Sequence, residues 1–181
     1  MTSDAFLNKV PLKDSFLKLL HMKKIALALS STLIMLSVFS QKEEKNGTIY
    51  IKHPYIDIVN KSVKAYLDRD VATNKTLFAD TARFWFTGMP KWIPMADAFQ
   101  SWTTDADFYD SIKLKVVGYP DYLAYKDQDA KVVQSWWTWM GKSKKTGEWV
   151  RIDFVAFNTF NKVGKMDSET LYGDFSKLVK E

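Results

Sequence analysis

The sequence of 181 residues contains no cysteine. Disulfide bonds, thiolate metal sites and cysteine nucleophiles are therefore excluded, and so is a lipoprotein anchor, which needs a cysteine at its cleavage site. Histidine is scarce as well, because only His53 follows residue 40. A single histidine cannot form a histidine-based metal site, and His53 directly precedes a predicted helix, where a structural role is the simpler interpretation. We expect no metal and no cofactor.

No apolar run is long enough to cross a membrane comfortably. The longest, Ile25–Phe39, follows two lysines and is followed by Ser40, with Val38 two positions before it. This pattern predicts a secretory signal peptide over residues 22–40, with an uncleaved signal anchor as the alternative. Residues 1–21 would then be an upstream extension, with Met22 as an alternative start. We expect a secreted or periplasmic protein with no stable membrane anchor after cleavage.

The excess of positive charge belongs largely to this amino-terminal segment. The whole chain has a formal net charge of +5, with 26 Lys and Arg against 21 Asp and Glu. Residues 1–40 hold five basic and two acidic residues, which leaves 21 against 19 and a net charge of +2. The remaining basic cluster, Lys142, Lys144 and Lys145, lies in a predicted turn. We therefore expect no nucleic-acid partner.

Residues 41–53 are interpreted as a polar linker and residues 54–181 as one domain. Hydrophobic periodicity and turn residues define its expected elements. The expected helices are 54–67, 72–78 and 95–107, and the expected strands are 82–86, 111–118, 122–126, 131–142, 148–160 and 165–174. Helices followed by a run of antiparallel strands predict an α+β fold with the helices gathered on one face of a sheet.

Aromatic residues are abundant, at 15% of the chain, and four of the seven tryptophans lie in one predicted hairpin. They are Trp136, Trp137, Trp139 and Trp149. Strand alternation places Trp137 and Trp139 on one face and Trp136 on the other, so both faces of the sheet carry bulky aromatic side chains. One face would pack on the helices and surround a pocket. The other would pack on a second subunit.

Several short segments resemble the nuclear transport factor 2-like superfamily, which includes SnoaL-like cyclases and ketosteroid isomerases. The segments are Asp70–Ala72, Leu77–Asp80, Trp139–Gly141, Thr146-Gly147, Phe160–Met166 and Tyr172–Asp174. Their order and spacing cover most of the chain after residue 54. The resemblance implies a cone-shaped, strongly bent and mostly antiparallel sheet with about three helices on its concave face, which together enclose a pocket. It also implies a homodimer through the outer face of the sheet.

The catalytic residues of ketosteroid isomerases are not found at the matching positions. The resemblance places the carboxylate base of those enzymes at Phe86, the oxyanion tyrosine at Ser62 and the oxyanion acid at Ala156. None of these side chains can play the corresponding role, which argues against an isomerase of that kind. A SnoaL-like cyclase would need a histidine and an aspartate in the pocket, and no predicted strand supplies a histidine.

Asp153 is the best single catalytic candidate on the sequence alone. Alternation puts Arg151, Asp153, Val155 and Phe157 on one face of their strand and an apolar set on the other. If the first face is concave, Asp153 is a pocket carboxylate; if it is convex, Asp153 and Arg151 form a solvated or dimer-facing surface. The apolar set suits packing against helices, which favours the second interpretation.

Two hypotheses of different class follow. The first is a non-catalytic exported domain that binds a small apolar molecule or a protein partner; the second is a SnoaL-like pocket hydratase, isomerase or hydrolase using a lone carboxylate such as Asp153 or Asp80. The sequence favours the first. A cavity carboxylate within hydrogen-bond reach of a second polar group would favour the second. The predicted pocket residues are Tyr66, Trp85, Phe99, Trp102, Trp137 and Asp153.

Overall fold

A computed structural model describes residues 17–25 and 44–178 of the chain. The chain divides into two units, residues 1–44 and 45–181, and we consider each by itself. In the first unit residues 17–25 are helical. Most of the predicted signal peptide, and most of the predicted upstream extension, lie outside the described residues. None of the described helices is long and apolar enough to cross a membrane.

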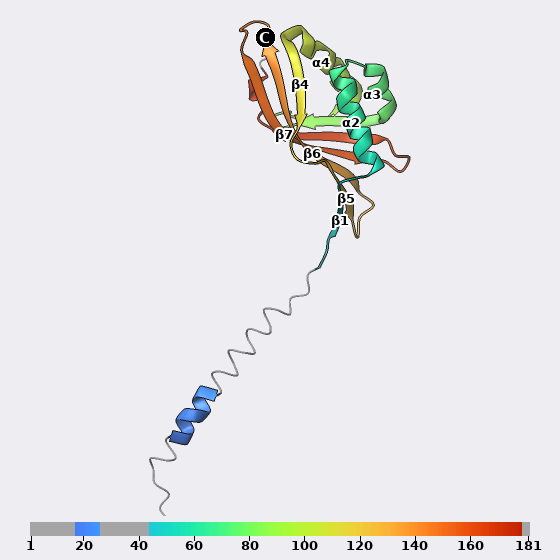
Figure 1. Cartoon of the computed structure of the whole chain (residues 1–181). Helices are drawn as coiled ribbons and strands as arrows, with labels where there is room; N and C mark the ends of the chain where they lie inside the picture. Colours follow the sequence, from blue (N-terminus) through green and yellow to red (C-terminus); the bar gives the residue numbers. More distant parts are fainter. Residues whose placement is uncertain (1–16, 26–43, 179–181) are drawn as a thin grey trace, which may run out of the picture. The chain divides into compact units, whose positions relative to one another are not determined.

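The second unit is an α+β domain whose curved sheet has eight strands (Figure 1). The helices are α2 (Pro54–Leu67), α3 (Val71–Leu77), α4 (Met95–Phe108) and a short 3₁₀ turn η1 (Phe175–Lys177). The strands are β1 (Gly47–Tyr50), β2 (Phe78–Phe86), β3 (Ile93–Pro94), β4 (Tyr109–Val116), β5 (Asp121–Tyr125), β6 (Lys131–Ser143), β7 (Trp149–Phe160) and β8 (Met166–Gly173). This confirms the predicted fold class.

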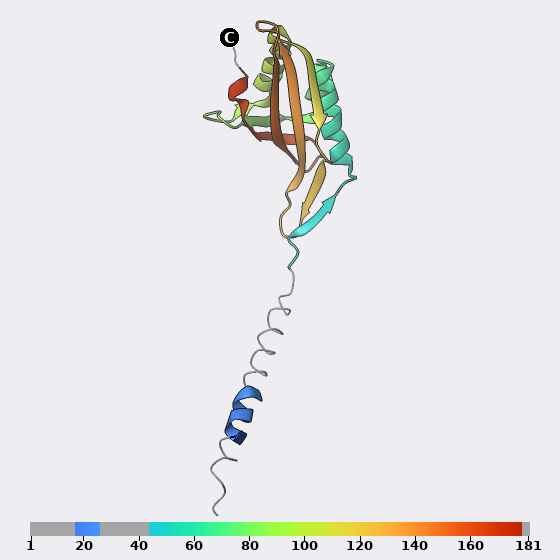
Figure 2. The ribbon, with the colours of Figure 1, turned by 60° about the vertical axis from the view of Figure 1, so that its left-hand side comes forward.

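The sheet order is β1-β5-β6-β7-β8-β2-β3, and β4 pairs with the second half of β6. All pairings are antiparallel except that of β2 with β8. The helices α2, α3 and α4 lie on one side of the sheet, and β1 and β5 form the part of it that is farthest from α4 (Figures 1 and 2). One face of the sheet is thus covered by helices, and the other is not covered by any described element.

Helix α2 begins where the sequence predicted it, for identifiable reasons. Pro54 occupies the first turn, where its missing N–H is not needed, and the His53 ring nitrogen Nδ1 accepts a hydrogen bond from the Tyr55 N–H at 3.2 Å. The His53 ring also stacks on Tyr122, with ring centroids 3.7 Å apart. His53 is therefore a helix cap packed against β5, which agrees with a structural role.

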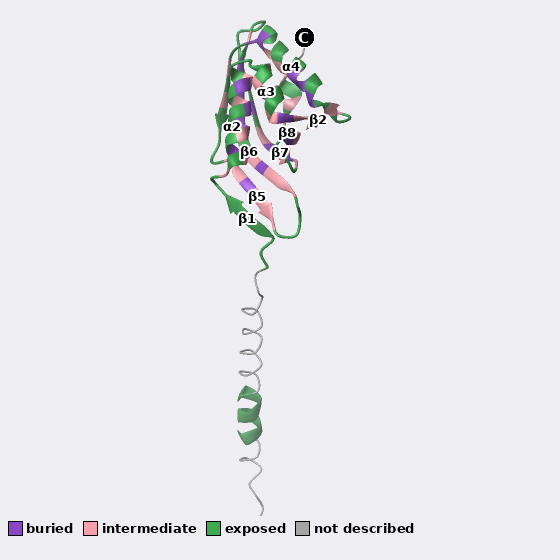
Figure 3. Cartoon of the chain, turned by 90° about the vertical axis from the view of Figure 1, so that its right-hand side faces the viewer, coloured by how far each residue is buried: buried purple, intermediate pink, exposed green. Residues whose placement is uncertain are grey.

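Most boundaries lie within two residues of the expected ones, the short strand β3 was not expected, and two further differences are larger. Strand β2 begins at Phe78, whereas the sequence predicts a helix as far as residue 78 and a strand only from residue 82. Residues 47–50, taken as part of a polar linker, form β1 and pair with β5. All four residues of β1 are exposed (Figure 3). An exposed edge strand has no buried face, and so it lacks the hydrophobic alternation by which strands are recognised in a sequence.

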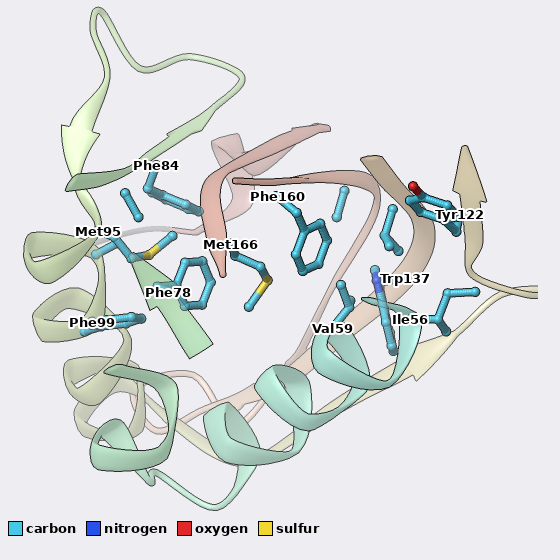
Figure 4. Close-up of a cluster of buried hydrophobic side chains, with 14 residues drawn as sticks. Ile56, Val59, Phe78, Phe84, Met95, Phe99, Tyr122, Trp137, Phe160 and Met166 are labelled. Atoms are coloured by element: carbon cyan, nitrogen blue, oxygen red, sulfur yellow. The ribbon is translucent and has the colours of Figure 1, made fainter. Parts of the chain in front are cut away.

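The main hydrophobic core lies between the helices and the concave face of the sheet. Figure 4 shows Phe78 and Met166 near its centre, with Phe99 of α4 on one side. Trp137 of β6 lies beside Ile56 and Val59 of α2 in the same cluster. A smaller cluster contains Tyr109, Trp139 and Ile152. The aromatic hairpin β6–β7 therefore supplies side chains to both clusters, as the wall of a bent sheet.

A β-bulge in β8 determines which of its side chains face the helices. Met166 pairs with Phe160 and Ser168 pairs with Thr159, so Asp167 is an extra residue in the ladder. Beyond the bulge Glu169 pairs with Asn158 on one side and with the buried Phe84 on the other. Met166 and Glu169, three residues apart, therefore both face the concave side. Simple alternation from Met166 would have turned Glu169 outward.

Candidate functional site

A cavity of about 710 Å³ opens between the helices and the concave face of the sheet. Its walls come from α2, α4, five strands and the η1 segment, and most of its lining side chains are apolar or aromatic. Large, mostly apolar pockets with a few convergent polar groups are the usual form of small-molecule sites. The aromatic lining residues are Tyr66, Phe84, Phe86, Trp102, Trp137, Trp139, Phe154 and Phe175.

Glu169 and Asn158 form a polar pair in this apolar wall. The Asn158 side-chain Nδ2 donates to Glu169 Oε1 at 3.2 Å, across the β7–β8 ladder. Asn158 is 1% exposed. Glu169 keeps some accessible surface as a residue, but its Oε2 atom has almost none, and neither Oε2 nor Asn158 Oδ1 has a hydrogen-bond partner. The pair is thus shielded and incompletely satisfied.

This environment changes the acidity of Glu169. Burial raises the pKa of its carboxyl group from 4.5 to about 7, and the hydrogen bond from Asn158 offsets part of the rise. A group with such a pKa is present in both protonation states near neutral pH. It can therefore accept a proton from a bound molecule or donate one to it.

A second polar cluster lies elsewhere on the wall and joins three elements. The Tyr66 hydroxyl of α2 donates to Asp105 Oδ2 of α4 at 2.9 Å and accepts from the Trp139 indole Nε1 of β6 at 2.8 Å. Burial, and then the negative charge of Asp105, raise the pKa of Tyr66 well above its usual value. Tyr66 therefore stays neutral, and its donated hydrogen bond is committed to Asp105.

Asp153, the catalytic candidate from the sequence, does not line the cavity. It lies on the outer face of β7, where Arg151 Nη2 donates to its Oδ1 at 3.0 Å and the Thr138 hydroxyl donates to the same atom at 2.5 Å. The hydrogen bonds from Arg151 and Thr138 hold the pKa of Asp153 below its usual value. Both charged side chains are more than half exposed. The convex interpretation of this face is the one that the structure shows.

The other predicted pocket residues divide into three groups. Tyr66, Trp102 and Trp137 line the cavity. Phe99 lies behind Trp102, with ring centroids 5.4 Å apart, and belongs to the core. The prediction for Trp85 is corrected: its indole Nε1 donates to the Met89 carbonyl at 3.0 Å and its ring packs on Tyr172, away from the cavity.

The residues that matter most at this site were not among those predicted. Asn158 continues the inward series of Ile152, Phe154 and Ala156 by one step, so alternation could have identified it. Asp105 follows Trp102 by three residues, which places both on one face of a helix. The sequence contains no such signal for Glu169, because the bulge at Asp167 reverses the inward and outward alternation of side chains along β8.

The positions that matched the ketosteroid isomerase roles do belong to the cavity. Phe86, Ser62 and Ala156 all line it. The Ser62 hydroxyl donates to Asn74 Oδ1 at 2.7 Å. Glu169, the carboxyl group with the raised pKa in this cavity, is thus carried by β8 and not by β2, on which that comparison placed the base. Among the described residues, no group of three or more His, Asp or Glu is arranged to hold a metal ion.

Comparison with solved structures identifies the fold. The putative polyketide cyclase IdmH from Streptomyces antibioticus superposes with a TM-score of 0.57 at 14% identity, over 70% of this chain and 96% of that one. A nuclear transport factor 2-like superfamily protein from Salmonella enterica serovar Typhimurium gives 0.57 at 14%, over 68% and 90%. SalBIII, an epoxide hydrolase/cyclase-like enzyme in salinomycin pyran ring formation, gives 0.56 at 16%, over 68% and 93%.

These likenesses show the nuclear transport factor 2-like fold, in agreement with the sequence resemblance. No protein-family model matches the chain, and no curated protein is similar to it in sequence. At identities of 14 to 16%, the superpositions concern the fold alone. Function has to be argued from the cavity itself.

Proposed function

We propose that this nuclear transport factor 2-like domain is a pocket enzyme that transfers a proton to or from a small, largely apolar molecule, with Glu169 as the transferring group. The single observation that carries the proposal is the Glu169–Asn158 pair, a shielded carboxyl group in the cavity wall with a polar partner at 3.2 Å. A cavity carboxyl group with a polar partner within hydrogen-bond reach supports an enzyme over a non-catalytic binding domain. Asn158 would hold the carboxyl group in place, and the aromatic walls would hold the substrate.

Each part of this arrangement has a physical role. Burial brings the pKa of Glu169 to about 7, which suits a general acid or base near neutral pH. The wall shields Glu169 Oε2 from water, which strengthens hydrogen bonds and charge interactions of this carboxyl group. The fold neighbours named as cyclase-like enzymes lend support to a proton-transfer reaction on a small organic molecule.

The experiment uses a general-base probe, since the natural substrate is not identified. Ring opening of 5-nitrobenzisoxazole requires removal of one carbon-bound proton, and the neutral aromatic probe suits an apolar cavity. We expect the rate to rise with pH and to level off above about 7, as Glu169 ionises. Glu169→Gln should lower kcat/KM by about a hundredfold or more, the usual contribution of a positioned base.

Asp153→Asn is the matched control, because it removes a carboxylate from the outer face of the same sheet. Its rate and pH profile should equal those of the wild type. Both variants should be checked for an unchanged fold by circular dichroism. Equal rates for wild type and Glu169→Gln at pH 8, with the probe shown to bind, would refute the proposal and leave the non-catalytic binding hypothesis.

The export of the domain is a separate part of the proposal. It is supported by the signal-like pattern of residues 22–40. Expression of the full chain in a bacterial host, followed by intact-mass analysis of the periplasmic fraction, should give a mature protein that begins at Gln41. A protein that stays in the cytoplasm with its full mass would contradict export.

A further inference from the structure

Two buried hydrogen-bond acceptors in the cavity wall lack a donor. They are Asn158 Oδ1 and Glu169 Oε2, on neighbouring strands and at directly paired positions. Buried polar atoms are nearly always paired, because an unpaired one gives up its hydrogen bonds to water without replacement. A proton on Glu169 can meet part of this need. A ligand that brings its own N–H donors can meet all of it once the two side chains turn toward the cavity, since both atoms are shielded in their present positions.

The charges of the cavity wall all have one sign. The ionisable side chains among its described lining residues are Asp105, Glu169 and Asp174, together with the neutral Tyr66, and none is Lys, Arg or His. The carboxylate of Asp174 lies near Lys177, which offsets its charge at the edge of the site. Asp105, which accepts the hydrogen bond from Tyr66, and Glu169 are the acidic groups of the interior. The cavity is thus acidic, although the chain as a whole has a net charge of +5.

Aromatic rings supply most of the rest of the wall. Trp102 makes edge contacts with Tyr66 and Phe84 at centroid distances of 5.7 Å. Trp137 and Trp139 present further indole rings from β6. The negative faces of aromatic rings attract cations and repel anions. The unpaired acceptors, the acidic groups and the aromatic rings therefore all favour a cationic ligand with N–H donors.

We infer that the cavity selects a molecule with an apolar body and a primary or secondary amine, whose ammonium N–H groups donate to Asn158 Oδ1 and Glu169 Oε2 after these two side chains turn toward the cavity, because neither atom has accessible surface in the arrangement described above. The inference rests on the proposed function only in using the same cavity, and it names the class of substrate. The simplest proton transfer moves one proton from the ammonium nitrogen to Glu169 Oε2. It leaves a neutral amine and a neutral carboxylic acid, and the amine regains a reactive lone pair.

The test compares four ligands that share one apolar body: 1-adamantylmethylamine, its trimethylammonium analogue, 1-adamantanemethanol and 1-adamantanecarboxylate. Calorimetry at pH 8 gives the affinities, and quenching of the cavity tryptophans reports binding at this site. We expect the amine to bind about tenfold more tightly than the alcohol, because its hydrogen bonds are charge-assisted, and the carboxylate to bind most weakly. The trimethylammonium analogue should bind less tightly than the amine, since it has no N–H donor.

Glu169→Gln should remove most of the advantage of the amine over the alcohol, while Asp153→Asn should keep it. An alcohol or carboxylate that binds as tightly as the amine overturns the inference, and so does the absence of amine binding at millimolar concentration. An amine preference that survives in Glu169→Gln, or that the trimethylammonium analogue shares fully, overturns the assignment to this pair. These affinities do not depend on turnover, so the inference and the proposed function can fail separately.

Discussion

The two faces of the curved sheet shift the pKa of a carboxyl group in opposite directions. On the concave face Glu169 is shielded, and burial raises the pKa of its carboxyl group to about 7. On the convex face Asp153 is exposed, and hydrogen bonds from Arg151 and Thr138 lower the pKa of its carboxyl group. The two residues lie on neighbouring strands. Which way a side chain points therefore decides whether its carboxyl group has a raised pKa in a shielded wall or a lowered pKa on an exposed surface.

The largest expected contrast is between two adjacent tryptophans of β6. Trp137 faces inward and is 6% exposed, while Trp136 faces outward and is 38% exposed. Trp137→Ala should lower the free energy of unfolding by about 3 to 5 kcal/mol, because it removes core contacts and leaves a cavity. Trp136→Ala should cost the folded subunit much less. Urea denaturation of both variants measures the difference, and equal losses would mean that the outer face is packed as tightly as the core.

The next contrast concerns pH. A raised carboxyl pKa means that folding stability is lost as the pH rises from the unfolded-state pKa of 4.5 to the folded-state value of about 7. The loss reaches about 3 kcal/mol above that range, by the usual conversion of a pKa shift. Glu169→Gln has no carboxyl group to titrate and escapes this loss. The difference in free energy of unfolding between the variant and the wild type should therefore be more favourable to the variant at pH 8 than at pH 4.

Asp153→Asn should change the pH dependence of the free energy of unfolding in the opposite direction. A lowered pKa adds stability that is present above the ordinary value and is lost as the pH falls. The effect should be small, because the ion pair is exposed to water. Denaturation curves of both variants at the two pH values test the comparison. A pH-independent effect of Glu169→Gln would show that its carboxyl group titrates normally.

The loss of a side-chain hydrogen bond should also cost more stability on the concave face than on the convex face. Tyr66→Phe removes the hydroxyl that accepts from the Trp139 indole, so a part-buried donor loses its partner at a cost of about 2 kcal/mol. Thr138→Val on the outer face leaves Asp153 paired with Arg151 and should cost less than about 1 kcal/mol. Thermal unfolding compares them. A greater loss for Thr138→Val would reverse the ranking of the two faces.

The predicted homodimer would add a further difference between the two faces. The outer face carries the exposed rings of Trp136 and Tyr172, joined across the sheet by Val155 between them. We expect native mass spectrometry of the mature protein to show a dimer. Trp136→Ala should weaken it by about tenfold or more, as for an aromatic side chain central to an interface. A monomeric wild type would leave this face a solvated surface.

Much of the architecture could be predicted from local patterns. The 3.6-residue spacing of α2, the start of that helix at Pro54 and the alternation of β6 and β7 were all visible, because each reports one element that is buried on one side. The segments that resemble the nuclear transport factor 2-like superfamily also predicted that the sheet is curved and that it encloses a pocket. Strand β1 escaped detection, since it has no buried side to impose a pattern.

The candidate site could be predicted only in part. Tyr66, Trp102 and Trp137 were identified because large aromatic residues on helix-facing positions tend to line such pockets. Asp153 was misleading as a catalytic candidate, because the sequence gives the two faces of a strand but not their direction. Trp85 was placed on the wrong side for the same reason.

Most of the elements, the fold class and the lack of cysteine follow from the sequence alone, because these depend on residue types and short-range periodicity. The tertiary structure decided where the acid lies. The bulge at Asp167 turns Glu169 inward, and pairing with Asn158 places it in an apolar wall that shifts its pKa. Burial of a carboxyl group depends on neighbours that are distant in the chain, and no local pattern records them.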